Sequence, residues 1–263
     1  MYYDPHTLIS VGYAFLGGIV PSIIWLLFWM REDREHPEPL RMIIRVFVGG
    51  MFAVIISLIL EKLVFGMNPS LVFRGNFLQA ILAWLSQVAS AEGIDLSKLL
   101  LVVVFAPIIE ETAKFFMAWI LALRTKADIW AIDPMIYMIV TALGFAALEN
   151  MLFLFDPILR NNLASSITTG DMRFIGATLL HTVASSTIGI MISFHFFNKK
   201  ISRSFWTLVG LISAIFIHSL FNLLMVQLSQ ASIIVLEAIW ILVIIVLLAF
   251  EKIKQVRVEK IEA

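Results

Sequence analysis

The feature that most constrains this chain is a succession of apolar stretches, each about 20 residues or longer, separated by segments that carry most of the charges. Hydrocarbon offers no partner for backbone N–H and C=O groups, so stretches of this kind cross a bilayer as α-helices. A chain of 263 residues that is 60% hydrophobic also exceeds the apolar share of ordinary soluble domains. We therefore expect an all-α fold, a polytopic transmembrane helix bundle.

Seven of these stretches are long enough to span the membrane. An eighth apolar segment, residues 77–88, is short and interrupted by polar side chains, so it is interpreted as an interfacial or re-entrant helix. Neither an internal repeat nor a soluble domain is evident, which predicts a single membrane domain over residues 1–263. The expected spans are residues 8–30, 46–65, 99–123, 134–155, 174–197, 205–228 and 231–250.

The distribution of lysine and arginine predicts the orientation. With the N-terminus outside, seven spans place thirteen basic residues on the cytoplasmic side and five, including Arg173, on the outer side. This bias follows the positive-inside rule, whereas treating residues 77–88 as a full span would scramble it. We expect a multi-pass protein of the cell membrane with a cytoplasmic C-terminus.

Composition narrows the chemistry. The formal net charge is zero, so nothing points to a nucleic-acid partner. The absence of cysteine excludes disulfides, thiolate nucleophiles and thiolate metal sites. Carboxylate, imidazole, hydroxyl and amide groups remain.

Several such groups fall inside the predicted spans. A charged side chain near the centre of a membrane helix costs about 2.5–3.5 kcal/mol on insertion scales, so each one needs a reason to be there. The candidates are Glu110, Glu111 and Lys114 in the third span, Glu149 and Asn150 in the fourth, His181 in the fifth, and His218 and Asn222 in the sixth.

Their depth indicates a common site. Successive spans run in opposite directions, so depth below the outer face must be counted from alternate helix ends. At about 1.5 Å per residue, Glu110, Glu149, His181 and His218 lie roughly 9–17 Å below that face. Four helices thus present ionisable groups at overlapping depth. Glu237 in the seventh span falls at a similar depth, but no polar motif surrounds it.

Helical spacing assigns faces to these groups. Glu110 and Lys114 are four residues apart, as are His218 and Asn222, so each pair shares one helix face. We expect Lys114 to keep one of the two adjacent carboxylates ionised while the other points into the site. The alternative is that Glu111 and Lys114 form a purely structural buried ion pair.

Carboxylates, imidazoles and an amide are the groups that peptide-bond hydrolysis requires. A carboxylate can deprotonate a water molecule, and imidazole and amide donors can stabilise the oxyanion. Alternatively, His181, His218 and Glu110 offer a ligand set for a divalent metal such as zinc. No HExxH motif occurs, so a metal site would be assembled across helices. Both mechanisms are open at this point, with either no cofactor or one divalent metal ion.

The ordered motifs resemble those of PrsW-type intramembrane proteases, which are similar to the CAAX prenyl endopeptidase and bacteriocin-immunity superfamily. The resemblance runs from about residue 30 to 225. It rests on Glu35-His-Pro-Glu-Pro39, Glu110-Glu111-x-x-Lys114, Phe145-x-x-x-Glu149-Asn150, the lone His181 and His218-x-x-x-Asn222.

This resemblance implies an intramembrane endopeptidase that cuts a membrane-anchored protein near the extracytoplasmic face, for example an anti-sigma factor. It implies that Glu110 or Glu111 activates water and that Glu149 and His181 complete the polar centre. His218 and Asn222 would then bind the oxyanion or a metal. Many members of the wider superfamily have histidine where this chain has Glu149, which weakens a three-histidine zinc model.

Two other functions fit buried acids and histidines. A proton-coupled transporter also uses such residues, but transporters of this kind commonly carry repeats and paired broken helices, and no second half mirrors the segments around Glu110 or Glu149. A non-catalytic scaffold or immunity protein would retain the polar cluster without needing its charges.

Overall fold

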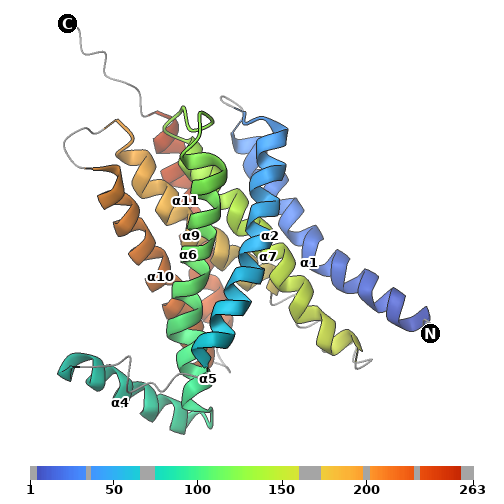
Figure 1. Cartoon of the computed structure of the whole chain (residues 1–263), viewed down its shortest axis with the longest axis vertical. Coiled ribbons are helices and arrows are strands. Elements are labelled where there is room, and N and C mark those ends of the chain that lie inside the picture. The colour runs from blue at the N-terminus through green and yellow to red at the C-terminus, as the bar shows by residue number, and fades with distance from the viewer. Residues whose placement is uncertain are drawn as a thin grey trace, which may run out of the picture.

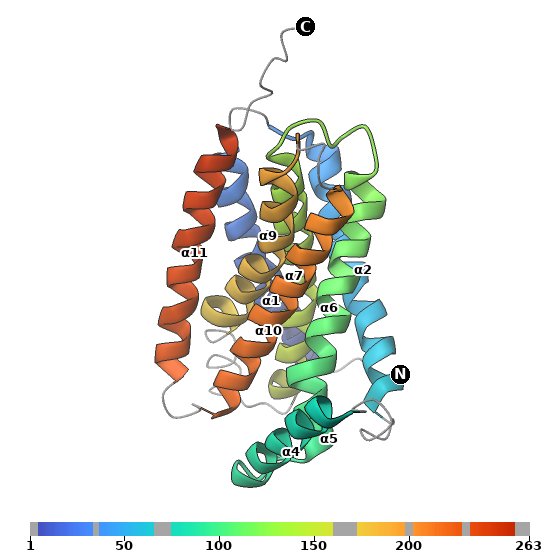
Figure 2. The ribbon, with the colours of Figure 1, turned by 90° about the vertical axis from the view of Figure 1, so that its left-hand side faces the viewer.

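The computed structural model describes residues 5–33, 37–65, 75–159, 173–197, 202–227 and 232–255. The regular secondary structure in these ranges is entirely helical, and the long helices run side by side in one bundle (Figures 1 and 2). The predicted all-α bundle is confirmed. Five single helices are long and apolar enough to cross a membrane: α1 (Pro5–Glu32), α2 (Leu40–Phe65), α7 (Asp133–Leu159), α10 (Arg203–Gln227) and α11 (Ser232–Lys254).

Of the seven predicted spans, five are single helices of this kind, whereas the third and fifth are composites of shorter helical segments. In π-helical turns the backbone bonds reach five residues back instead of four, which divides a long helix into segments. The third predicted span consists of α5 (Leu96–Leu100), η1 (Leu101–Phe105), α6 (Ala106–Ala118) and η2 (Trp119–Leu123). The fifth predicted span consists of η3 (Arg173–Ala177) and α9 (Thr178–Phe194).

The segment predicted to be interfacial or re-entrant forms α4 (Asn76–Ala91), which lies across one end of the bundle (Figure 2). One side of α4, including Leu85 and Val88, packs against Leu99 and Leu100 at the start of the third helix. Phe77 is exposed on α4. An amphipathic helix crossing the bundle end in this way has the arrangement of an interfacial helix. We refer to this end as the α4 end.

Helix α7 is the centre of the bundle and packs against α1, α2 and α9. Its approach to α2 depends on two glycines. A Cβ atom on Gly144 would collide with the backbone of Phe47, and one on Gly50 would collide with the backbone of Thr141. Small residues let membrane helices pack backbone to backbone. This contact fixes the position of α2 relative to the middle of α7.

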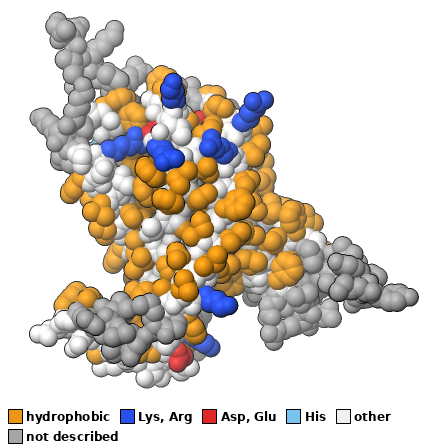
Figure 3. Space-filling view, in the orientation of Figure 1, with side chains coloured by type: hydrophobic (Ala, Val, Ile, Leu, Met, Phe, Trp, Pro, Cys, Tyr) orange, Lys and Arg blue, Asp and Glu red, His pale blue; other side chains and the backbone are white. Residues whose placement is uncertain are grey.

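The surface agrees with a multi-pass membrane protein. Hydrophobic side chains cover the sides of the bundle on the face shown in Figure 3, and lysines and arginines gather near the end opposite α4. Large exposed side chains of the long helices include Leu63, Phe216 and Leu248.

At that opposite end, a buried tyrosine joins α7 to the segment before α2. The Tyr137 hydroxyl donates its proton to the Glu38 carboxylate, and its oxygen also lies 3.2 Å from the Ala127 carbonyl oxygen. Burial raises the pKa of Glu38 from its ordinary 4.5 to about 7, although the Tyr137 hydrogen bond opposes this shift. Of the motif at residues 35–39, the first two residues lie outside the described ranges.

Candidate functional site

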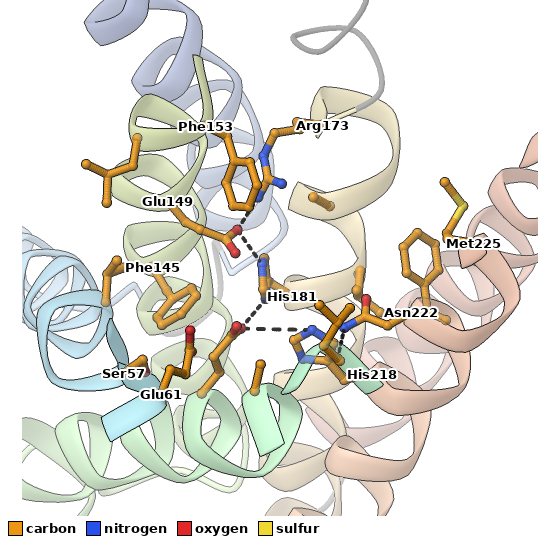
Figure 4. Close-up of a pocket in the computed structure, with 18 of the residues that line it drawn as sticks. Ser57, Glu61, Phe145, Glu149, Phe153, Arg173, His181, His218, Asn222 and Met225 are labelled. Carbon is orange, nitrogen blue, oxygen red and sulfur yellow. Dashed lines mark hydrogen bonds and ion pairs between the residues drawn. The ribbon is translucent and has the colours of Figure 1, made fainter. Parts of the chain in front are cut away.

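A cavity of about 530 Å³ lies in the half of the bundle nearer the α4 end. Its walls come from the second half of α2, α7 and α10 and from the first turns of η1, α6, η3, α9 and α11. Because successive helices run in opposite directions, these segments lie at one level, as the depth calculation predicted. The walls are mostly apolar. The polar side chains lining the cavity are Ser57, Glu61, Glu110, Glu149, Arg173, His181, His218 and Asn222 (Figure 4).

Glu111 and Lys114 form a fully buried ion pair behind this cavity. Lys114 Nζ lies 2.5 Å from Glu111 Oε1, and both side chains are completely enclosed. His218 Nδ1 is 2.9 Å from the same oxygen, and Ser185 Oγ donates to Glu111 Oε2 at 2.6 Å. Both carboxylate oxygens are therefore engaged. Glu111 holds Lys114 and His218 in place and does not face the cavity.

Glu110 is in the opposite situation. Its Oε2 atom is buried and has no hydrogen-bond partner among the described residues. It lies 3.9 Å from His181 Nδ1, 3.9 Å from His218 Nε2 and 4.0 Å from Lys114 Nζ. The lysine thus pairs more closely with Glu111 than with Glu110, despite the favourable four-residue spacing. An unsatisfied buried carboxylate oxygen is costly, and its orientation toward the cavity points to a ligand or reactant there.

The two histidines present matching geometry to Glu110. His181 Nε2 lies 2.9 Å from Glu149 Oε2, and His218 Nδ1 lies 2.9 Å from Glu111 Oε1. If each imidazole donates its N–H to that carboxylate, the other ring nitrogen carries the lone pair. Those second nitrogens are the ones facing Glu110 Oε2, and His181 Nδ1 also accepts a hydrogen bond from Lys114 at 2.9 Å.

Arg173 belongs to this cluster, which corrects its placement among the outer loop charges. Its guanidinium pairs with Glu149 Oε2 and donates from Nε to Asn150 Oδ1 at 2.6 Å. Asn150 in turn donates to Thr178 Oγ1 at 2.9 Å. Arg173 and Glu149 are 24 residues apart in the sequence. No spacing motif could therefore have identified the pair.

Asn222 lines the cavity but uses its amide to complete the third helix. Its Nδ2 donates to the carbonyl oxygen of Val102 at 2.9 Å. In the π-helical turn of η1, Ala106 N–H bonds the carbonyl of Leu101, so the next donor in that pattern would be residue 107. Pro107 has no N–H, which leaves the Val102 carbonyl for Asn222. One amide hydrogen of Asn222 remains for a substrate.

The same side chains could hold a divalent metal ion. One ligand atom from each of Glu110, His181 and His218 lies within 4.8 Å of the others, and all three residues are buried. Both imidazoles have their other nitrogen on a carboxylate, which is the usual support for metal-binding histidines. Lys114 would have to release His181 Nδ1 for that atom to bind a metal. The described side chains therefore fit either a water activated by Glu110 or a bound metal.

The predicted site residues occupy three positions relative to the cavity. Glu110, Glu149, His181, His218 and Asn222 line it, Glu111 and Lys114 lie directly behind it, and Asn150 supports Arg173 at its edge.

Comparisons with known proteins agree with this geometry. Residues 38–250 match the model of the family described as PrsW family intramembrane metalloprotease. The chain is 30% identical over 232 residues to Protease PrsW of Clostridioides difficile (strain 630), covering 87% of this chain and 86% of that protein. It is 24% identical over 211 residues to Protease PrsW of Geobacillus kaustophilus (strain HTA426), covering 79% and 77%. No solved structure gives a significant match. The chain therefore belongs to the PrsW family of intramembrane metalloproteases and is a multi-pass membrane peptidase.

Proposed function

We propose that the peptidase reaction takes place in the cavity at the α4 end and that Glu110 is the residue that takes a proton from the attacking water. One observation carries this assignment. Glu110 Oε2 is the buried carboxylate oxygen that faces two imidazole nitrogens and has no hydrogen-bond partner among the described residues. Glu111, the neighbouring candidate, has both oxygens engaged.

The remaining groups divide into those that touch the substrate and those that position them. His181 and His218 face the cavity with the ring nitrogens that carry the lone pair, so the free amide hydrogen of Asn222 offers a donor to the oxyanion that forms as water attacks the carbonyl carbon. Glu149 keeps the His181 ring oriented. Behind the cavity, Glu111 does the same for His218.

Glu110, His181 and His218 fit a divalent metal ion as a carboxylate and two imidazoles. When bound, such an ion supplies Lewis-acid polarisation of the substrate carbonyl. Two contributions of the chain are the same with or without a metal ion. Glu149 and Glu111 fix the two rings, and the apolar wall around the cluster limits the access of bulk water.

We further propose that residues 1–263 act as one domain with the N-terminus outside and the C-terminus cytoplasmic. The lysines and arginines near the end opposite α4 support this orientation by the positive-inside rule (Figure 3). The cavity then opens toward the extracytoplasmic half of the membrane. A membrane-anchored protein is the substrate class, and the family resemblance supports an anti-sigma factor.

Cleavage of single-span reporter proteins by the full-length chain tests this proposal. Wild type should release the extracytoplasmic part of a reporter, and Glu110→Gln should abolish release without reducing the amount of folded protein. Glu237→Gln is the matched control, because Glu237 is an exposed acid of α11 that does not line the cavity. Cleavage retained in Glu110→Gln would refute the assignment.

Treatment with a chelator separates metal-dependent hydrolysis from water activation by Glu110 alone. If a metal ion is required, chelation of the purified enzyme should stop cleavage and zinc should restore it. Activity that persists after exhaustive chelation would leave water activation to Glu110 alone.

A further inference from the structure

Two polar side chains of α2 line the catalytic cavity without taking part in the network around Glu110. Ser57 and Glu61 are four residues apart, so they project from the same face of the helix. Figure 4 shows both on the α2 side of the cavity, across from His181 and His218. Neither residue belongs to a motif of the family resemblance.

Neither side chain has a partner within the described ranges. Ser57 is 1% exposed, and its buried Oγ atom makes no hydrogen bond to any described residue. The Glu61 carboxylate makes no hydrogen bond or ion pair there, and the adjacent Lys62 is exposed on the outside of the helix. A buried hydroxyl and a carboxylate at membrane depth are both costly when unpaired. Both side chains point into the cavity, which indicates that a group bound there provides their missing partner.

The charge of the cavity specifies the kind of occupant. Three carboxylates line it, those of Glu61, Glu110 and Glu149, but Arg173 is the permanent cation among the lining residues. Arg173 is already paired with Glu149. The lining thus carries more acidic than basic groups, and surrounding apolar side chains strengthen the resulting field. A positively charged group is the occupant that this field favours.

We propose that Ser57 and Glu61 form a specificity subsite that binds a lysine or arginine side chain of the substrate beside the scissile bond. This inference rests on the proposed function, since it places the substrate in the same cavity. Glu61 supplies the counter-charge, and the Ser57 hydroxyl accepts one N–H of the ammonium or guanidinium group. The apolar stem of the basic side chain lies along Val54 and Leu58, which also line the cavity.

A binding measurement tests the subsite independently of catalysis. Full-length Glu110→Gln protein in lipid nanodiscs is titrated with synthetic single-span peptides carrying one lysine, scanned through the extracytoplasmic third of the span. Matched peptides carry norleucine, which has nearly the same stem without the charge. At one position the lysine peptide should bind about tenfold more tightly, as expected for a single partly buried ion pair.

Variants of α2 then identify the partner. Adding Glu61→Gln should erase the lysine preference, and adding Glu61→Lys should favour a peptide with glutamate at the same position. Adding Glu237→Gln, an exposed acid away from the cavity, should leave the preference unchanged. Equal affinities for lysine and norleucine peptides, or a preference that survives Glu61→Gln, would overturn the proposal. Binding that depends on Ser57 alone would indicate a backbone N–H as the occupant and would also overturn it.

Cleavage of the same peptides by wild type keeps the two proposals distinguishable. If wild type cleaves peptides without any basic preference, the proposed function stands and the subsite fails. If the preference is seen in binding while no peptide is cleaved, the subsite stands and the catalytic assignment fails.

Discussion

Glu110 and Glu111 are adjacent acids, and the structure predicts opposite consequences for replacing them with glutamine. Glu111 bonds Lys114 at 2.5 Å, His218 at 2.9 Å and Ser185 at 2.6 Å, and it is completely enclosed. Neutralising it leaves the buried Lys114 without its closest counter-charge. Removing one partner of a buried ion pair typically costs about 3–5 kcal/mol. Glu110→Gln breaks no hydrogen bond of Oε2, so its cost should stay below about 1 kcal/mol.

Activity and stability measured on the same samples separate these consequences. The free energy of unfolding in mixed micelles should fall by about 3 kcal/mol or more for Glu111→Gln and should be nearly unchanged for Glu110→Gln. Reporter cleavage should be lost in both variants. In Glu111→Gln the site is deformed, and in Glu110→Gln the proton acceptor is gone. Glu237→Gln should behave as wild type in both assays. The reasoning is refuted if Glu111→Gln is as stable as wild type, or if the two variants lose equal stability.

Three further perturbations follow from individual contacts. Gly144→Val should lower stability by about 3 kcal/mol, because the new side chain forces α2 away from α7. Asn222→Ala should cost about 1–3 kcal/mol by leaving the Val102 carbonyl unsatisfied, and it should reduce the kcat of cleavage. Glu38 has a folded-state pKa of about 7, above its ordinary 4.5, so the unfolded chain loses this proton first as pH rises. The contribution of Glu38 to the free energy of unfolding should be greatest below about pH 4.5, decline toward pH 7 and level off above that pH. Glu38→Gln should flatten this part of the pH–stability curve.

Each of the three perturbations has its own control or contradicting outcome. Denaturant unfolding of Gly12→Val serves as the control for Gly144→Val, since a Cβ on Gly12 meets nothing within 4 Å, and equal losses would contradict the close-packing account. Unchanged stability of Asn222→Ala would show that the Val102 carbonyl does not depend on this amide. Stability titrated between pH 4.5 and 8 tests Glu38, and an unaltered slope in the variant would exclude this carboxyl as its source.

The sequence by itself determined the class of the fold and the level of the site. Long apolar stretches have one solution in hydrocarbon, namely helices, because backbone groups must be satisfied within the segment. Helical rise and alternating direction then placed Glu110, Glu149, His181 and His218 at one depth, which needs no knowledge of packing. The short segment at residues 77–88 was also distinguishable from a span by its length.

The tertiary structure decided which partner each charge has. Adjacent glutamates look equivalent in a sequence, but the packing of α9 and α10 around α6 gives Glu111 its partners Ser185 and His218 and leaves Glu110 unpartnered. The π-helical turns of the third and fifth spans were not predicted either, and the amide that bonds the Val102 carbonyl in the third span comes from α10, 120 residues away in the sequence.

Arg173 and Glu61 show the same limit from the side of the cavity. In the sequence Arg173 has the position of a loop charge, whereas in the structure η3 places it beside Glu149. Glu61 lies near the end of α2, where an acid at the membrane surface is expected, but it lines the cavity. Hydrophobic pattern and helical period are local properties, so a chain reveals them directly. The pairing of side chains from different helices depends on rotation and close approach, here set by contacts such as that between Gly144 and the backbone of Phe47. Those contacts exist only in the assembled bundle.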